Sequence, residues 1–244
     1  MAYKQWTGYG QTDIGSIRDE NQDSFVVIDH VGIWCVADGM GGHKEGGIAS
    51  HLVTQSLESL QNHSYDSLEQ LVEASRKVIS ESNRALCDMS DNFYGEDVIG
   101  TTIIALLIHG EKCAVLWAGD SRLYRMRNTS FELITRDHTH YEELFSKGLV
   151  GESTNEKTHP MSHMLTRALG ASCNCELDEM IFDIQAEDVF LLCSDGLSNV
   201  IEQLDLAKII YYSEDKKRAV ANLINMALAK QANDNVTALI VDRA

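Results

Sequence analysis

The chain has 244 residues, 44% of them hydrophobic and 23% charged, so it is long enough to form a large globular domain with a sizeable core. Its 37 acidic residues outnumber its 20 basic residues, which gives a net charge of −17. A field of that sign disfavours nucleic acid and anionic membranes as partners, and no apolar run approaches the roughly 20 residues that a bilayer span requires.

The first 89 residues are expected to contain two strands and then two helices. Apolar runs predict strands at Ser24–Asp29 and Gly32–Ala37. Apolar residues at helical spacing predict helices at Glu45–Leu60 and Ser67–Met89. Asp66, with Glu69 three residues later, is typical of an N-cap and its capping-box partner. We therefore expect the second helix to begin directly after Asp66.

The rest of the chain is expected to be richer in strands. Predicted strands lie at Thr101–Ile108, Lys112–Ala118, Arg122–Arg127, Val189–Cys193 and Val236–Val241. Several are apolar almost without interruption, which is typical of strands covered on both faces. Residues 219–228 predict an amphipathic helix. The polar, weakly patterned residues 138–162 predict a short helix and an exposed flap.

Runs of strands separated by runs of helices favour an α+β fold. Two stacked, mainly antiparallel sheets flanked by helices would cover both faces of the apolar strands. The only proline is Pro160, and the sequence shows no repeat or low-complexity linker. We therefore expect residues 1–244 to form a single domain.

The N-terminus and the cysteines indicate a cytoplasmic location. The first 15 residues lack the basic and apolar regions of a signal peptide. None of the six cysteines forms a C-x-x-C pair, and three lie in apolar runs, as reduced cysteines do.

Four aspartates stand at the ends of predicted buried strands. Three follow a strand and one precedes a strand, at Asp38, Asp120, Asp195 and Asp234. If these ends meet, the repulsion between the carboxylates requires cations to neutralise it. One Asp-Gly pair alone would indicate only a β-turn, but four such positions together predict a metal site. Its donors are all oxygens, which favours Mg²⁺ or Mn²⁺ over Zn²⁺.

Two neighbouring residue types suit a phosphate-binding metal site. Gly39, directly after Asp38, permits a tight turn in which a backbone carbonyl approaches a metal. Arg18 carries a guanidinium fork that binds two phosphate oxygens. An arginine in this position would otherwise be an ordinary surface residue, so its role depends on the neighbouring aspartates.

The chain resembles the type-2C metal-dependent Ser/Thr protein phosphatases, especially the compact bacterial ones. The matching segments occur in family order over nearly the whole chain, at residues 18–24, 36–43, 100–102, 118–122, 165–170, 194–197 and 234–237. The resemblance implies a β-sandwich flanked by helices, with a binuclear metal centre at one edge. It also implies that residues 138–162 are the variable flap of the family.

The resemblance further implies a role for each site residue. Asp38 would bridge two ions, the carbonyl of Gly39 would bind one, and Asp195 and Asp234 would complete the other. Asp120 with Asp195 would bind the third ion found in bacterial relatives. Asp23 would orient a metal-bound water, and Arg18 would hold the phosphate. Two or three Mn²⁺ or Mg²⁺ ions would then hydrolyse phosphoserine and phosphothreonine without a phosphoenzyme.

Two positions differ from the eukaryotic members of the family. Met40 replaces a histidine thought to protonate the leaving group, and Gln22 replaces a glutamate before Asp23. Bacterial relatives share both features. The general acid is therefore either the nearby His43 or a metal-bound water.

Other classes of function leave signatures that can be checked. No cysteine has an arginine six positions later, as Cys-dependent phosphatases require, and neither a D-x-D nucleophile nor a P-loop occurs. A binding-only pseudophosphatase would be expected to lack one or more metal aspartates. A metal-dependent hydrolase of small phosphoesters stays open as an alternative. We expect a monomer that acts on phosphorylated proteins, with a cognate Ser/Thr kinase as its functional partner.

Overall fold

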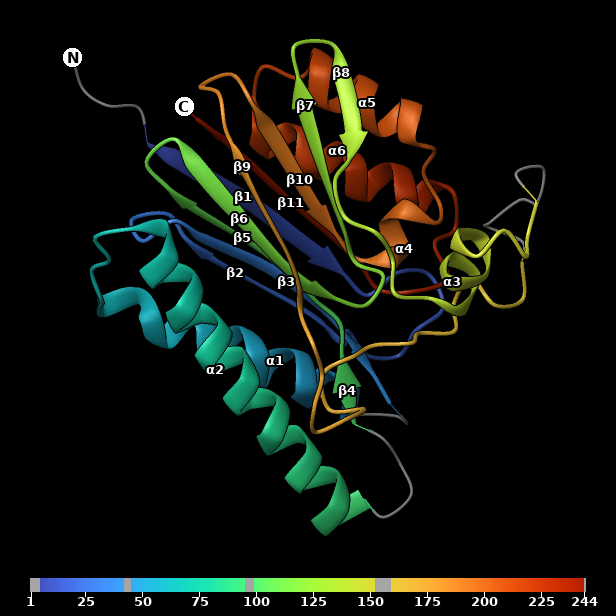
Figure 1. Cartoon of the computed structure of the whole chain (residues 1–244). Helices are drawn as coiled ribbons and strands as arrows, with labels where there is room; N and C mark the ends of the chain where they lie inside the picture. Colours follow the sequence, from blue (N-terminus) through green and yellow to red (C-terminus); the bar gives the residue numbers. More distant parts are fainter. Residues whose placement is uncertain (1–4, 42–44, 95–98, 152–158, 244) are drawn as a thin grey trace.

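Two antiparallel sheets stack face to face, and helices cover the outer face of each (Figure 1). The computed structural model describes residues 5–41, 45–94, 99–151 and 159–243. The predicted α+β class and the layered arrangement are confirmed. Nowhere in these ranges is a helix both long enough and apolar enough to cross a bilayer.

Each sheet pairs strands that follow one another in sequence with strands from distant parts of the chain. The first has the order β1-β11-β10-β7-β8, with bounds Trp6–Asp13, Val236–Arg243, Val189–Cys193, Arg122–Arg127 and Ser130–Leu133. The second has the order β2-β3-β5-β6-β9, with bounds Asp23–Ile28, Ile33–Met40, Ile103–His109, Lys112–Ala118 and Asp178–Asp183. The short β4, Gly100–Thr101, pairs with the end of β3.

The helices form two separate layers. Those on the second sheet are α1, Glu45–Glu58, and α2, Leu68–Met89, joined through the 3₁₀ turn η1, Ser59–Asn62, and followed by the π turn η2, Ser90–Tyr94. Those on the first sheet are α5, Gln203–Tyr212, and α6, Lys216–Ala229. Two short helices, α3 at His140–Ser146 and α4 at Asp195–Ser198, lie near the loop edge of the sandwich (Figure 1).

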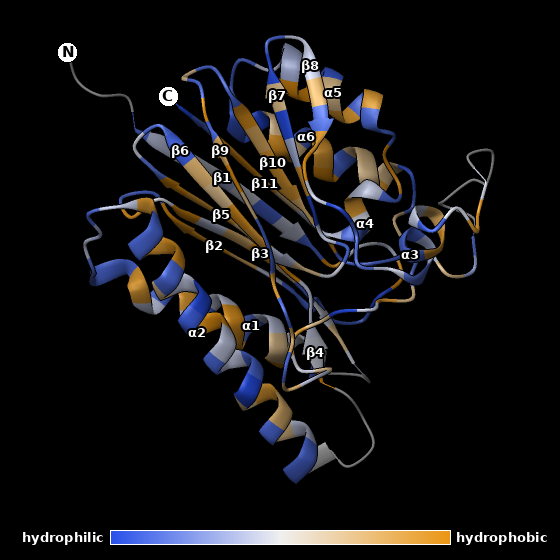
Figure 2. Ribbon diagram, viewed as in Figure 1, coloured by the Kyte–Doolittle hydropathy of each residue, from blue (hydrophilic) through white to orange (hydrophobic). Residues whose placement is uncertain are grey.

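The apolar runs are explained by three hydrophobic layers. Along β3, Trp34 and Val36 pack between the sheets, whereas Ile33 and Cys35 pack toward α1 and α2. The central strands are therefore apolar on both faces, while the outer faces of the helices are hydrophilic (Figure 2). This arrangement holds the strand ends rigidly.

The differences from the sequence-based elements have physical causes. Edge strands β1, β8 and β9 were not predicted, because they carry half-buried and exposed polar residues that weaken the apolar pattern. The predicted cap of α2 was wrong by one residue. Ser67, rather than Asp66, accepts the backbone N–H of Gln70, so α2 begins at Leu68.

Candidate metal and phosphate site

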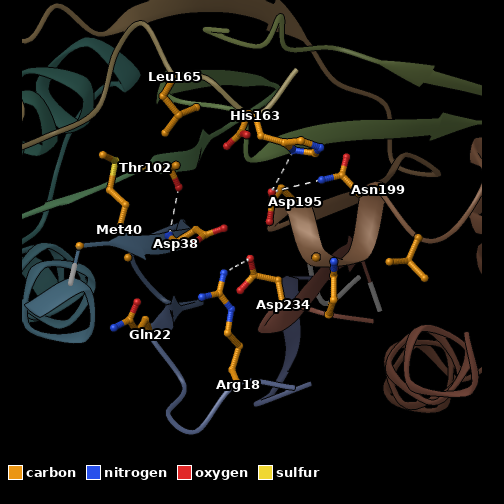
Figure 3. Close-up of a pocket in the computed structure, with 16 residues that line it drawn as sticks. Arg18, Gln22, Asp38, Met40, Thr102, His163, Leu165, Asp195, Asn199 and Asp234 are labelled. Atoms are coloured by element: carbon orange, nitrogen blue, oxygen red, sulfur yellow. Dashed lines mark hydrogen bonds and ion pairs between the residues drawn. The ribbon is translucent and has the colours of Figure 1, made fainter. Parts of the chain in front are cut away.

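The strand ends meet at a cleft of about 550 Å³ (Figure 3). Its lining includes the predicted residues Arg18, Asp38, Gly39, Asp120, Asp195 and Asp234. These residues come from both sheets. The structure therefore places the four strand-end carboxylates in one cleft.

Asp38 is held by its own backbone near the end of β3. Its N–H donates to Thr102 Oγ1 at 3.0 Å, and its carbonyl accepts from Thr101 Oγ1 at 2.9 Å and from Thr102 N at 2.8 Å. These bonds fix the backbone and leave the side chain directed into the cleft (Figure 3). Next to it, the backbone of Gly39 lies so close to α1 that an added Cβ would be 2.1 Å from Gly46 O.

Asp195 begins α4, where the chain turns away from β10. Asn199 donates its Nδ2 to Asp195 Oδ2 at 3.2 Å, and His163 Nδ1 lies 4.0 Å from the same oxygen. Neither Asn199 nor His163 was predicted. Asn199 caps α4 four residues after Asp195, a spacing that could have indicated the contact, whereas only the folded loop brings His163 to the cleft.

Asp234 and Arg18 meet on the opposite side of the cleft from His163 (Figure 3). Arg18 Nη2 donates to Asp234 Oδ2 at 2.7 Å. The adjacent Asn235 accepts from Gln22 N at 2.8 Å and donates to the carbonyls of Ile14 and Glu20 at 2.9 and 3.0 Å. Asn235 thus positions the loop that carries Arg18, a role that no local pattern in the sequence predicts.

Asp23 is not among the residues that line the cleft, and it is only 3% exposed. In the β2–β3 pairing it is opposite Asp38. Its Oδ2 accepts from Ser194 Oγ at 2.8 Å and from Thr237 Oγ1 at 2.6 Å. Its Oδ1 is buried and has no hydrogen-bond partner in the structure. A buried carboxylate oxygen in that state requires a proton, a water or a cation.

The carboxylates raise one another's proton affinity. Burial raises the pKa of Asp38 well above its usual value, and repulsion from Asp23, Asp195 and Asp120 adds to the effect. Burial and neighbouring aspartates likewise raise the pKa of Asp120 and of Asp195. The pKa of Asp23 is raised to about 7, mainly by burial and against its two hydroxyl bonds. Cations would remove this repulsion.

The donor set fits hydrated Mg²⁺ or Mn²⁺ better than a closed cage. No group of three or more His, Cys, Asp or Glu side chains in the described ranges is already arranged around one point as a metal site. Mg²⁺ in proteins usually keeps several waters and takes one or two carboxylates, so an open cleft lined with separate aspartates suits it. The orphaned Asp23 Oδ1 also fits a site completed by water and cations.

The two positions that differ from eukaryotic phosphatases have different surroundings. Met40 lines the cleft, and a thioether has no proton to donate to a leaving group. Gln22 also lines the cleft, and its backbone carbonyl accepts a hydrogen bond from Ser50 Oγ. His43, the candidate general acid, lies outside the described residues, as do residues 152–158 of the predicted flap.

Comparison with known proteins gives consistent matches. A family model described as protein phosphatase 2C matches residues 17–239. The serine/threonine phosphatase stp of Listeria welshimeri is 31% identical over 238 residues, which cover 96% of this chain and 94% of that protein. PppA, described as a key regulatory component of T6SS in Pseudomonas aeruginosa, has a TM-score of 0.89 and 32% identity, with 98% of both chains covered.

A third similar structure contains metal. It is the catalytic domain of the serine/threonine protein phosphatase PstP in complex with two manganese ions, with a TM-score of 0.83 and 29% identity. The match covers 98% of both chains.

Proposed function

Because this chain belongs to the protein phosphatase 2C family, we propose that it hydrolyses phosphoserine and phosphothreonine in proteins, using Mn²⁺ or Mg²⁺ held in the carboxylate cleft. The observation that carries the proposal is the meeting of Asp38, Asp195 and Asp234 in one cleft together with Arg18. The manganese complex of the similar PstP catalytic domain supports the choice of metal.

The proposed ligands divide between two or three ions. Asp38 and the carbonyl of Gly39 would hold one ion, and Asp195 and Asp234 would join Asp38 in holding another. Asp120 and Asp195 would hold a third. When bound, the ions neutralise these carboxylates and the phosphate and lower the pKa of an attacking water. No side chain of the cleft needs to form a bond to phosphorus, so the proposal has no phosphoenzyme.

Arg18 and Asp23 have separate proposed roles. The guanidinium of Arg18 holds phosphate oxygens while Asp234 keeps it directed into the cleft. Asp23 orients a water by accepting a hydrogen bond from it at Oδ1, which has no partner in the structure. The serine and threonine bonds to Oδ2 keep this orientation fixed. The leaving-group proton comes from His43 or from a water in the cleft, since Met40 cannot supply it.

The cellular setting is also a proposal. The substrates are phosphorylated proteins, and a Ser/Thr kinase that produces them is the expected functional partner. All six cysteines lie in described residues and are free, which suits a reducing cytoplasm. We expect the chain to act as a monomer.

A substrate comparison tests the proposed class. Phosphate release from phosphothreonine and phosphoserine peptides would be compared with release from ATP and a sugar phosphate at equal Mn²⁺. We expect the highest kcat/KM for the peptides. Preference for a small phosphoester would contradict protein phosphatase activity and favour the alternative hydrolase.

A further inference from the structure

We propose that Asp137 and His138 form a clamp that fixes the turn carrying Asp120, and thereby set the affinity of the chain for the ion bound there. The clamp is defined as these two residues. The inference rests on the proposed function, because it takes Asp120 as a metal ligand. The clamp residues are positioning residues that touch neither the substrate nor the metal.

His138 holds the residue before Asp120 through two hydrogen bonds. Its backbone N–H donates to Gly119 O at 2.9 Å, and its Nδ1 accepts from Gly119 N at 3.1 Å. This reciprocal pair occupies both backbone groups of Gly119. Because Nδ1 must accept, the ring must be neutral with its proton on Nε2. Burial lowers the pKa of His138, which favours that neutral form.

Asp137 holds the residue two positions after Asp120. Arg122 Nε donates to Asp137 Oδ1 and Oδ2 at 3.1 and 2.9 Å, and Arg122 Nη2 donates to Oδ2 at 2.6 Å. The two side chains are 12% and 9% exposed. A forked pair with so little solvent access fixes direction as well as distance. Asp120 thus lies between two anchored neighbours, Gly119 and Arg122.

The opposite face of the turn packs against the residue that also holds Asp38. Gly119 has φ +114°, and an added Cβ would lie 2.6 Å from Thr102 Cβ. Thr102 Oγ1 lies 2.8 Å from Ser121 Oγ and accepts from Asp38 N. The turn therefore lies between the clamp and Thr102. Thr102 supports the turn from the side opposite the clamp.

His138 is itself supported from the side away from the cleft. Its ring stacks on Trp117, with centroids 6.0 Å apart and planes 6° from parallel. Its Nε2 lies 3.2 Å from Asp178 Oδ2, a close polar contact that is not aligned as a hydrogen bond. Asp178 in turn accepts from Arg167. These contacts fix the direction of Nδ1.

The clamp is needed because the turn must hold the Asp120 carboxylate close to the negative charge of Asp195. Asp120 is 8% exposed and faces the charge of Asp195. Without an anchored turn, a carboxylate in that position would relax toward solvent. Residues that orient a metal ligand typically change metal affinity by about 10–100-fold when they are replaced.

The test measures Mn²⁺ binding to metal-free protein by isothermal titration calorimetry. Comparing Asp120→Asn with wild type identifies which of the bound Mn²⁺ ions depends on Asp120; we call this ion the Asp120 equivalent. His138→Leu removes the acceptor for Gly119 N, whereas His138→Asn offers an amide oxygen near the position of Nδ1. His109→Leu is the matched control, because the His109 ring also makes a hydrogen bond to a backbone group, the carbonyl of Tyr65, but at the far end of β5.

We expect His138→Leu to weaken the Asp120 equivalent at least tenfold and to leave the other equivalents within threefold. His138→Asn should stay within threefold of wild type, and His109→Leu should be unchanged. If His138→Leu does not fold, Arg122→Lys replaces it. That variant keeps the charge and loses the fork, and it should weaken the same equivalent.

The outcomes separate the clamp from the proposed function. A folded His138→Leu, or in its absence a folded Arg122→Lys, that binds every equivalent as wild type does would overturn the clamp alone. Equal stoichiometry in wild type and Asp120→Asn would remove Asp120 from the metal site and overturn the clamp with that assignment. A wild-type protein that binds no Mn²⁺ would overturn the proposed function itself.

Discussion

At the scale of the residue, the site consists of carboxylates that the fold holds together despite their repulsion. Their places at strand ends could be predicted, because a buried apolar run followed by aspartate is a local pattern. The bonds of Asn235 to the Arg18 loop could not be predicted, since Asn235 and Gln22 are 213 positions apart. The hydrogen bonds that hold Asp23 could not be predicted either, because they come from the distant hydroxyls of Ser194 and Thr237.

Asp38→Asn should lower kcat by about 100-fold or more while the fold is retained, because it removes a principal charge from the shared site. The change preserves size, so near-UV circular dichroism should match the wild-type spectrum. The measurement is kcat on a phosphothreonine peptide at saturating Mn²⁺. Wild-type kcat in the folded variant would refute the role of Asp38.

Arg18→Ala should raise KM for a phosphopeptide roughly tenfold and change kcat much less. A group that binds phosphate equally in the ground and transition states contributes mainly to KM. Arg18→Lys is the control, because it keeps the charge but loses the fork, and it should give an intermediate KM. An unchanged KM in Arg18→Ala would argue against phosphate binding by this residue.

At the scale of the element, buried strands were predicted well and edge strands poorly. The bounds of β6, β7 and β10 agree with the apolar runs that predicted them. The edge strand β9, by contrast, contains only exposed and half-buried residues, so its pairing with β6 comes from tertiary packing.

The approach of α1 to the end of β3 gives a matched pair of glycine substitutions. A Cβ at Gly46 would lie 2.8 Å from the backbone carbon of Gly39, whereas one at Gly47 would meet nothing closer than 3.8 Å. Gly46→Ala should therefore destabilise the protein by about 1–3 kcal/mol through overpacking. Gly47→Ala should stabilise it by about 0.4–1 kcal/mol, because Gly47 lies in the first turn of α1 and alanine reduces the conformational entropy of the unfolded chain. Urea unfolding measures both, and equal effects would show that the close approach is absent.

Substrate choice is predicted to lie in residues 138–162 rather than in the metal centre. The metal centre contacts only the phosphate that all substrates share, whereas this segment exposes apolar side chains, including Leu149 at 69% and Phe145 at 40%. Replacing residues 146–158 with a short Gly/Ser linker should leave p-nitrophenyl phosphate hydrolysis within several-fold and alter selectivity among phosphopeptides. Unaltered peptide selectivity would mean that the segment is an ordinary surface loop.

At the scale of the whole molecule, metal binding is coupled to stability and pH. The pKa of Asp23 is about 7 in the folded metal-free protein, and those of Asp38 and Asp120 are also raised. The folded state therefore binds more protons than the unfolded state between about pH 4 and pH 7. The stability contributed by Asp23 is present below about pH 4 and is lost as the pH rises through about 7, and the raised pKa values of Asp38 and Asp120 act in the same direction.

Mn²⁺ should offset that loss, because it binds the deprotonated carboxylates. The increase in Tm on adding saturating Mn²⁺ should thus be larger at pH 8 than at pH 5.5, as measured by differential scanning calorimetry. Asp38→Asn should reduce the increase at pH 8. An equal increase in Tm at both pH values would show that the carboxylates do not take up the metal.

The central claim is that the cleft is a cation-dependent phosphatase site, and the most direct test is a Mn²⁺ titration of metal-free protein with a phosphothreonine peptide. Phosphate release should rise from background as Mn²⁺ is added and should return to background with EDTA. Folded Asp195→Asn should stay near background at the same Mn²⁺ concentrations. Full turnover by the metal-free protein in the presence of EDTA would contradict the account.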